Sequence, residues 1–239
     1  MNISENARVL KDILEMSSEP VGVKFLEEKQ PLDGFETPKP SRYCQMLMEA
    51  RKGKSLLLTS ENITCPASAW AFGLKEPPEM LRSGAMLANM GIFGSAEAGK
   101  NTLSTMSRLE MGKYKAVACY PLINASLIPD VVIIESSVEH LMWVALARTF
   151  KTGGRLDFST AILEATCVDS TVIPFLYQKL NASLGCYGCR EATDLAMSEC
   201  LLGFPIKDLD EIVNSLLILK QKTIARVRDK SVFKAYSER

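Results

Sequence analysis

The sequence predicts an α/β or α+β fold, in which a mixed sheet is covered by helices. Short apolar stretches with strand-like patterning alternate with longer stretches of helical periodicity. No long run rich in Pro, Gly or Ser divides the chain, which favours a single domain over residues 1–239. With 47% hydrophobic and 23% charged residues, a chain of 239 residues can bury one sizeable core.

The first half of the chain contains helices and strands in turn. Residues 2–16 are predicted to form an amphipathic helix that Asn2 can cap. Val21, Val23 and Phe25 alternate along a half-buried strand. The further elements expected are a helix over 43–51, a strand over 55–58, a short helix before Gly73, a helix starting at Pro77, a helix over 100–109 and a strand over 115–120.

The second half continues the same pattern. Residues 131–134 are apolar enough for a central strand, and Ser137 opens a helix that runs to about Phe150. Helices are also expected over 169–179, 191–197 and 208–219, the last continuing toward the carboxy terminus. The pairs Cys44–Cys65 and Cys167–Cys186 recur at a similar spacing, so a degenerate duplication of two halves stays open as an alternative.

The charge balance excludes several classes of partner. Lys+Arg and Asp+Glu both number 28, so the chain has no electrostatic footprint for nucleic acid or an anionic membrane. The amino terminus lacks a signal-peptide pattern, and every apolar run is far shorter than the roughly 20 residues of a spanning helix. We therefore expect a cytoplasmic protein that binds neither nucleic acid nor membrane, and we leave a homo-oligomer open.

Two motifs carry little weight. His140 is the single histidine and lies near a predicted helix start, which disfavours Cys–His and Ser–His catalysis. Residues 94–101 approach a phosphate-binding P-loop, but Asn101 stands where the magnesium-binding hydroxyl belongs. A plain connector, or a glycine-rich loop lining another ligand pocket, is the favoured interpretation of this segment.

Cysteine carries the main chemical signal. In a reducing compartment, seven cysteines indicate metal binding or catalysis rather than disulfides. Cys119 lies within an apolar strand and Cys200 directly precedes Leu201, so these two are interpreted as core residues. The core interpretation fits the remaining five less well: Cys44, Cys65, Cys167, Cys186 and Cys189.

The neighbours of these cysteines favour an iron–sulfur cluster. Cys65 is followed by proline, which is typical of iron–sulfur ligand runs because proline turns the chain away from the cluster. Gly185 and Gly188 flank Cys186, so backbone amides can approach a bound thiolate. Structural zinc normally uses two close cysteine pairs, whereas only Cys186 and Cys189 form one here. Dispersed cysteines therefore favour an all-thiolate [4Fe–4S] cluster over zinc.

Several motifs in order resemble a known family. The chain is similar to the prokaryotic family that carries domain of unknown function 169, common in anaerobic archaea and bacteria. The similarity runs from about Val21 to Val213. The motifs that carry it are Tyr43-Cys44-Gln45, Leu57–Thr59 with Glu61-Asn62 and Cys65, Gly73-Leu74, Pro129-Asp130-Val131-Val132, Gly185-Cys186-x-Gly188-x-Arg190 and Gly203-Phe204-Pro205.

The resemblance implies no activity, but it bears on the ligand set. It implies that Cys44, Cys65 and Cys186 belong to the family pattern, that Cys189 is more variable, and that Cys167 fits as the fourth member. An anaerobic distribution favours an oxygen-sensitive cofactor. We therefore expect four thiolates around one [4Fe–4S] cluster, with Cys189 as the reserve ligand.

Two arginines lie near the expected cluster ligands, and two other functions remain as alternatives. Arg42 and Arg190 lie within four residues of expected ligands and would balance the negative charge of the cluster. The cluster would serve a redox partner in electron transfer, or act as a Lewis acid on a small-molecule substrate if one iron is open. The alternatives are a structural zinc protein that binds a small ligand or partner, and a thiol redox enzyme using Cys186 and Cys189. The last is disfavoured, because such dithiols usually sit at a helix start after a strand.

Overall fold

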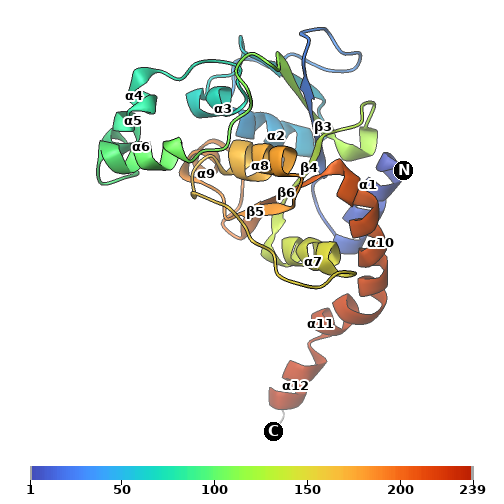
Figure 1. Cartoon of the computed structure of the whole chain (residues 1–239). Coiled ribbons are helices and arrows are strands. Elements are labelled where there is room, and N and C mark those ends of the chain that lie inside the picture. Colours follow the sequence, from blue (N-terminus) through green and yellow to red (C-terminus); the bar gives the residue numbers. More distant parts are fainter. Residues whose placement is uncertain (1, 238–239) are drawn as a thin grey trace.

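A six-stranded sheet forms the centre of the molecule (Figure 1). The structure is a computed structural model and describes residues 2–237. The strands are β1 (Val21–Leu26), β2 (Leu56–Thr59), β3 (Ala116–Pro121), β4 (Val131–Ser137), β5 (Asn181–Ser183) and β6 (Glu199–Pro205). They lie in the order β2-β3-β1-β4-β6-β5, and neighbouring strands are antiparallel. The expected fold class is confirmed, with an antiparallel sheet in place of the mixed one.

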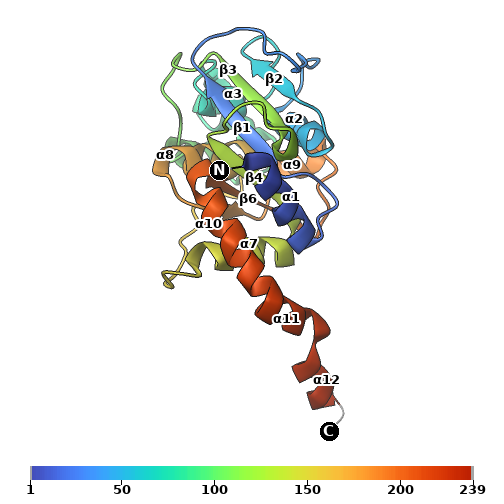
Figure 2. The same ribbon diagram turned by 90° about the vertical axis from the view of Figure 1, so that its right-hand side faces the viewer.

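Helices cover both faces of the sheet (Figures 1 and 2). A π-helix over Ala165–Val172 runs directly into α8, and a further wide turn over Lys220–Ile224 joins α10 to α11. The α-helices are α1 (Ile3–Leu14), α2 (Tyr43–Arg51), α3 (Pro66–Ala71), α4 (Glu79–Arg82), α5 (Ala85–Asn89), α6 (Ala96–Ser104), α7 (Val138–Thr149), α8 (Ile173–Tyr177), α9 (Tyr187–Ala192), α10 (Leu209–Leu219), α11 (Ala225–Asp229) and α12 (Ser231–Ser237).

The alternation of strand residues divides the core between the two faces. Val21, Val23 and Phe25 face the side covered by α2, α3, the π-helix and α8, as their period of two predicts. Val132 and Ile134 of β4 face the opposite side, where α1, α7 and α10 pack. The sheet is therefore buried on both faces, and the helices on the first face carry most of the cysteines.

The predicted helix starts at Asn2 and Ser137 are confirmed. The Asn2 side chain accepts a hydrogen bond from the Glu5 amide at 3.1 Å, and the Ser137 hydroxyl accepts one from the His140 amide at 3.3 Å. His140 itself meets the Ser136 hydroxyl through Nδ1 at 2.7 Å, as a residue near a helix start. In the glycine-rich segment 94–101, Ser95 caps α6.

The segment 181–205 differs from expectation. The helix expected over 191–197 instead spans Tyr187–Ala192, and the strands Asn181–Ser183 and Glu199–Pro205 were not predicted. The run that forms β6 contains Gly203 and ends in Pro205, two residues that usually indicate a turn. Both are tolerated, because Pro205 is the last residue of the strand and Gly203 lies beneath the π-helix.

The two halves of the sheet repeat one arrangement. β1 pairs with β3 and β3 with β2, while β4 pairs with β6 and β6 with β5. The two sets meet at the central β1–β4 pair. Their registers correspond, because Val21 lies opposite Pro121 in one half and Val131 lies opposite Pro205 in the other.

The turns after β3 and β6 correspond as well. A single turn of 3-10 helix follows each strand. The Leu122 amide donates to the Pro20 carbonyl at 2.8 Å, and the Ile206 amide donates to the Asp130 carbonyl at 3.1 Å. Pro20 and Asp130 directly precede β1 and β4. The repeat therefore extends from strand order to individual hydrogen bonds.

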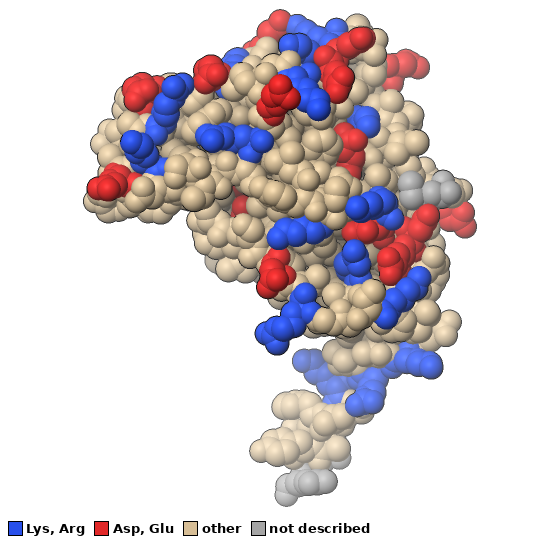
Figure 3. Space-filling model, viewed as in Figure 1, with Lys and Arg blue, Asp and Glu red and all other residues tan. Residues whose placement is uncertain are grey.

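The carboxy-terminal helices extend away from the body (Figure 2). Basic side chains gather around α11, whereas Lys and Arg alternate with Asp and Glu over the visible face of the body (Figure 3). α11 and α12 contain no buried residue. No helix within residues 2–237 combines the length and the apolar character needed to cross a membrane.

Candidate functional site

Five cysteines line one cavity of about 340 Å³ beside the first face of the sheet. They come from elements that are far apart in the sequence. Four of these residues are buried and Cys65 is partly exposed. The cysteines are Cys44, Cys65, Cys167, Cys186 and Cys189.

Each of these cysteines lies at or near a helix start. Cys44 is the second residue of α2, and Cys167 is the third residue of the π-helix. Cys65 caps α3, whose first residue is proline, and Cys186 caps α9. Cys189 follows in the first turn of α9. Short helices thus present their amino-terminal turns to the cavity, and the thiols come with them.

The thiols influence one another's ionisation. Burial, together with the nearby Cys65 and Cys186, raises the pKa of Cys44 to about 12. Burial also raises the pKa of Cys167 well above its usual range, again with contributions from Cys65 and Cys186. Cys65 and Cys186 thus affect both Cys44 and Cys167, in agreement with the cavity that all four line.

Cys186 and Cys189 form a close pair. The Cys186 amide donates to Sγ of Cys189 at 3.1 Å, and the Cys189 amide donates to Sγ of Cys186 at 3.4 Å. The hydrogen bond between the side chains lowers the pKa of Cys189 to about 7 and raises that of Cys186, which burial raises further. The dithiol lies at the start of helix α9, which follows strand β5. This is the position that the dithiols of thiol redox enzymes usually occupy, and the sequence did not predict it.

The thiols do not close on a single point. Among residues 2–237, no group of three or more His, Cys, Asp or Glu side chains is arranged to hold one metal ion. The sulfurs instead line the walls of the cavity described above. Cys119 is fully buried in β3, and Cys200 lines a separate apolar cavity beside α7, so neither lines the cysteine cavity.

The two arginines take different positions. Arg42 lines the cavity, where its guanidinium donates to the Gly188 carbonyl at 3.3 Å and pairs with Glu191 at 3.2 Å. Arg190 points into the loop that follows α9. Its guanidinium donates to the carbonyl groups of Leu184, Ala196 and Glu199 at 2.5 to 2.9 Å, and so ties the segment before α9 to the loop and the strand after it.

Glu164 is a cavity residue that the sequence pattern did not indicate. It caps the π-helix with φ 53° and ψ 33°, a left-handed conformation that is uncommon for glutamate. Burial, together with the nearby Cys186, raises the pKa of its carboxyl to about 8. A positive φ is a property of the folded backbone, so no sequence signal marks this residue.

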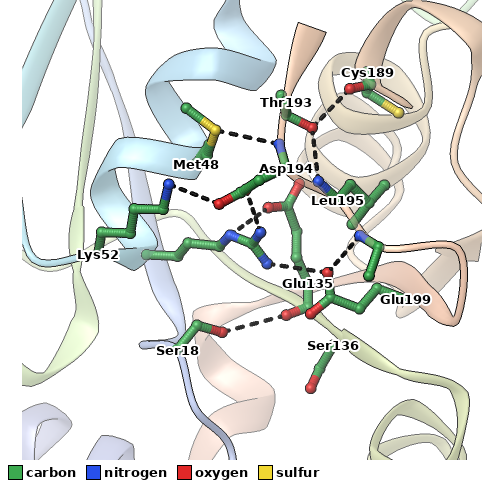
Figure 4. Close-up of polar contacts among 12 residues, drawn as sticks. Ser18, Met48, Lys52, Glu135, Ser136, Cys189, Thr193, Asp194, Leu195 and Glu199 are labelled. Carbon is green, nitrogen blue, oxygen red and sulfur yellow. Dashed lines mark hydrogen bonds and ion pairs between the residues drawn. The ribbon is translucent and has the colours of Figure 1, made fainter. Parts of the chain in front are cut away.

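An ionic network centred on the buried Arg51 lies near the dithiol (Figure 4). Arg51 pairs with Glu135 at 3.4 Å, with Asp194 at 2.5 Å and with Glu199 at 3.5 Å. It thereby ties α2 to β4, to β6 and to the loop between α9 and β6. The Thr193 hydroxyl donates to the Cys189 carbonyl at 2.7 Å, which connects this loop to the dithiol.

An antiparallel sheet flanked by helices, with a cysteine-lined cavity on one face, defines a cysteine-rich α+β protein. The chain belongs to the family described as Uncharacterised ArCR, DUF169, whose model matches residues 9–215. It is also similar to Uncharacterized protein MJ0308 of Methanocaldococcus jannaschii. The two are 28% identical over 223 residues, which cover 92% of this chain and 95% of that protein. No solved structure matches the chain.

Proposed function

We propose that this protein binds one [4Fe–4S] cluster through Cys44, Cys65, Cys167 and Cys186. One observation carries the proposal: these four cysteines, from four separate elements, line the same cavity. All-thiolate coordination is what such clusters require. Because the ligands come from distant parts of the chain, cluster assembly would be coupled to folding.

The internal repeat supports this choice of four ligands. Each half supplies one cysteine in the first turn of a helix, Cys44 or Cys167. Each half also supplies one cysteine that caps a short helix after the outermost strand, Cys65 or Cys186. The ligand set is then two pairs at corresponding positions, as a duplication of two halves would produce. Cys189 has no counterpart in the first half.

The space between the thiols supports a cluster over zinc. A structural zinc ion is enclosed by four ligands at about 2.3 Å and leaves no cavity between them. The cysteines here form part of the wall of a cavity of about 340 Å³. The raised pKa values of Cys44 and Cys167 mean that a bound metal must supply the positive charge that stabilises the thiolates.

The proposed role is electron transfer with a redox partner, or Lewis-acid chemistry on a small substrate if one iron is left open. Either role requires reduced thiols and therefore a reducing compartment such as the cytoplasm. Arg42 lines the cavity and would offset part of the negative charge of the cluster. Arg190 would act indirectly, by holding the loop after the dithiol in place.

The test is metal analysis of protein purified without oxygen. We expect about four iron and four sulfide per chain, and broad absorption near ~400 nm from thiolate–iron charge transfer. Each of the single substitutions Cys44→Ser, Cys65→Ser, Cys167→Ser and Cys186→Ser should lower the iron content. Cys119→Ser and Cys200→Ser are the matched controls and should keep it. A colourless protein with one equivalent of zinc, or iron retained in all four variants, would contradict the proposal.

A second candidate function follows from the dithiol at the start of α9. Thiol redox enzymes use a Cys-x-x-Cys pair in which one thiol has a lowered pKa, and Cys189 has this property. In that case a metal-free protein would exchange disulfides, and either Cys186→Ser or Cys189→Ser would abolish the exchange. In the cluster protein, Cys189→Ser should leave most of the iron bound.

A further inference from the structure

The cysteine cavity has a second wall made of apolar side chains. This wall comes from α4, α5 and the turn after α5, segments that contain none of the cysteines. It faces the thiols across the same space. The residues are Leu81, Met86, Leu87, Met90 and Ile92, with Leu163 beside them. The whole cavity, about 340 Å³, is at the lower end of the range of small-molecule sites, which starts near ~300 Å³, so a molecule that lies beside a bound cluster must be small.

Glu164 is the buried acid in this cavity. It is 8% exposed and lines the cavity together with Cys167 and Cys186. Within residues 2–237, no group forms a hydrogen bond with this carboxyl. A buried polar group without a partner is costly, and non-glycine residues with positive φ concentrate at functional sites. Glu164 combines both properties at the rim of the π-helix that carries Cys167.

We propose that the cavity also binds a small organic molecule whose hydroxyl or amino group donates a hydrogen bond to Glu164. Its apolar body would lie against the α4–α5 wall. This inference deepens the proposed function, since it names the substrate class that would lie beside the cluster. A donor is expected because no described residue hydrogen-bonds the Glu164 carboxyl, and Arg42, the cation that lines the cavity, is already paired with Glu191.

The experiment compares two probes that differ by one hydroxyl group. 4-Fluorobenzyl alcohol and 4-fluorotoluene are titrated into the anaerobically purified protein, and binding is followed by fluorine NMR. The alcohol should bind about tenfold more tightly, because only the alcohol satisfies the carboxyl. Glu164→Leu should remove this difference, whereas Glu164→Gln, which can still accept a hydrogen bond, should keep most of it. Met90→Lys, which places a charge in the apolar wall, should lower the affinity for both probes.

The outcomes separate this inference from the cluster proposal. If the cluster is present, reducing it to a paramagnetic state should broaden the fluorine signal of the bound alcohol. Preferential binding of the alcohol without broadening would support the ligand site and count against the cluster. Equal affinity of the two probes for the unmodified protein would overturn the inference, whether or not the Glu164 variants fold. An alcohol affinity unchanged in Glu164→Leu would overturn it too.

Discussion

Arg51 is a buried cation near the candidate site. Its side chain is 7% exposed and meets three carboxylates, of which Glu135 is 2% exposed. A buried charge is tolerated when it is paired, and removing one partner leaves the other charge buried and unpaired. Arg51 therefore stabilises the contact of α2 with β4 and β6, and with it the position of Cys44.

Arg51→Leu should lower the free energy of unfolding by about 1–3 kcal/mol, because Glu135 loses its buried partner, while protonation of its carboxyl limits the cost. Urea denaturation measures this change. Arg82→Ala is the matched control, since the ion pairs of Arg82 are exposed and should contribute about 0–1 kcal/mol. Equal effects of the two substitutions would show that the buried network does not stabilise the fold.

Glu135 should make stability depend on pH. Burial raises the pKa of its carboxyl from 4.5 to about 7, although Arg51 acts in the opposite direction. The folded chain then binds more protons than the unfolded chain between these values. Stability from the protonated carboxyl is therefore full below pH 4.5 and is lost as the pH rises through about 7.

The measurement is urea denaturation of the unmodified protein and Glu135→Gln across this pH range. The variant should remove a decrease on the order of 3 kcal/mol. Part of the slope should remain, because burial also raises the pKa of Asp169 to about 6. Glu27→Gln, at an exposed position, should not alter the slope. A slope that persists unchanged in Glu135→Gln would count against a raised pKa.

At the scale of elements, the π-helix depends on a glycine in the strand beneath it. A Cβ at Gly203 would lie 1.9 Å from the Ser170 carbonyl oxygen, so only glycine allows this approach. Pro174 follows in α8, where its ring disfavours the regular α-helical hydrogen bond to Ser170. The π-helix that carries Cys167 can therefore pack closely against β6 only because residue 203 is a glycine.

Gly203→Ala should destabilise the fold by about 1–3 kcal/mol or more, because backbone atoms of the π-helix must move. Thermal and urea unfolding measure the loss. If the cluster proposal holds, iron content should fall as well, since Cys167 moves with the π-helix. Gly94→Ala is the control, because a Cβ there meets nothing within 4 Å. Equal stability of the two variants would contradict this account of the packing.

The dithiol helix illustrates why some elements could not be predicted. Glycine and cysteine have little helix propensity, so residues 185–190 were expected to form a loop. In the fold, Cys186 and Cys189 exchange backbone-to-sulfur hydrogen bonds and cap α9. The helix expected over 191–197 consequently ends at Ala192, which frees residues 199–205 to form β6.

At the scale of the whole molecule, the sheet brings two similar halves together. Strands β1 and β4 form the centre, and the cysteine-bearing helices of both halves lie on one face. The carboxy-terminal part has a different role. Ile224 is buried at 2% exposure, whereas α11 and α12 contribute no buried residue.

Truncation should therefore have unequal effects. Ending the chain after Asp229 should change the free energy of unfolding by less than about 0.5 kcal/mol, because the described residues it removes are exposed. Ending it after Leu219 also removes Ile224 and should cost about 1.5–3 kcal/mol. Urea denaturation of both shortened chains tests this, and a large loss from the shorter deletion would show that α12 packs against the body.

The sequence by itself determined the fold class, the alternation of Val21, Val23 and Phe25 onto one face of β1, and the caps at Asn2 and Ser137. These features depend on local patterning, which acts over one or two turns of chain. Only the tertiary structure decided that β6 is a strand, that Glu164 lies among the thiols and that Arg51 joins three carboxylates. Those features depend on contacts between residues far apart in sequence, and such contacts exist only after the chain has packed.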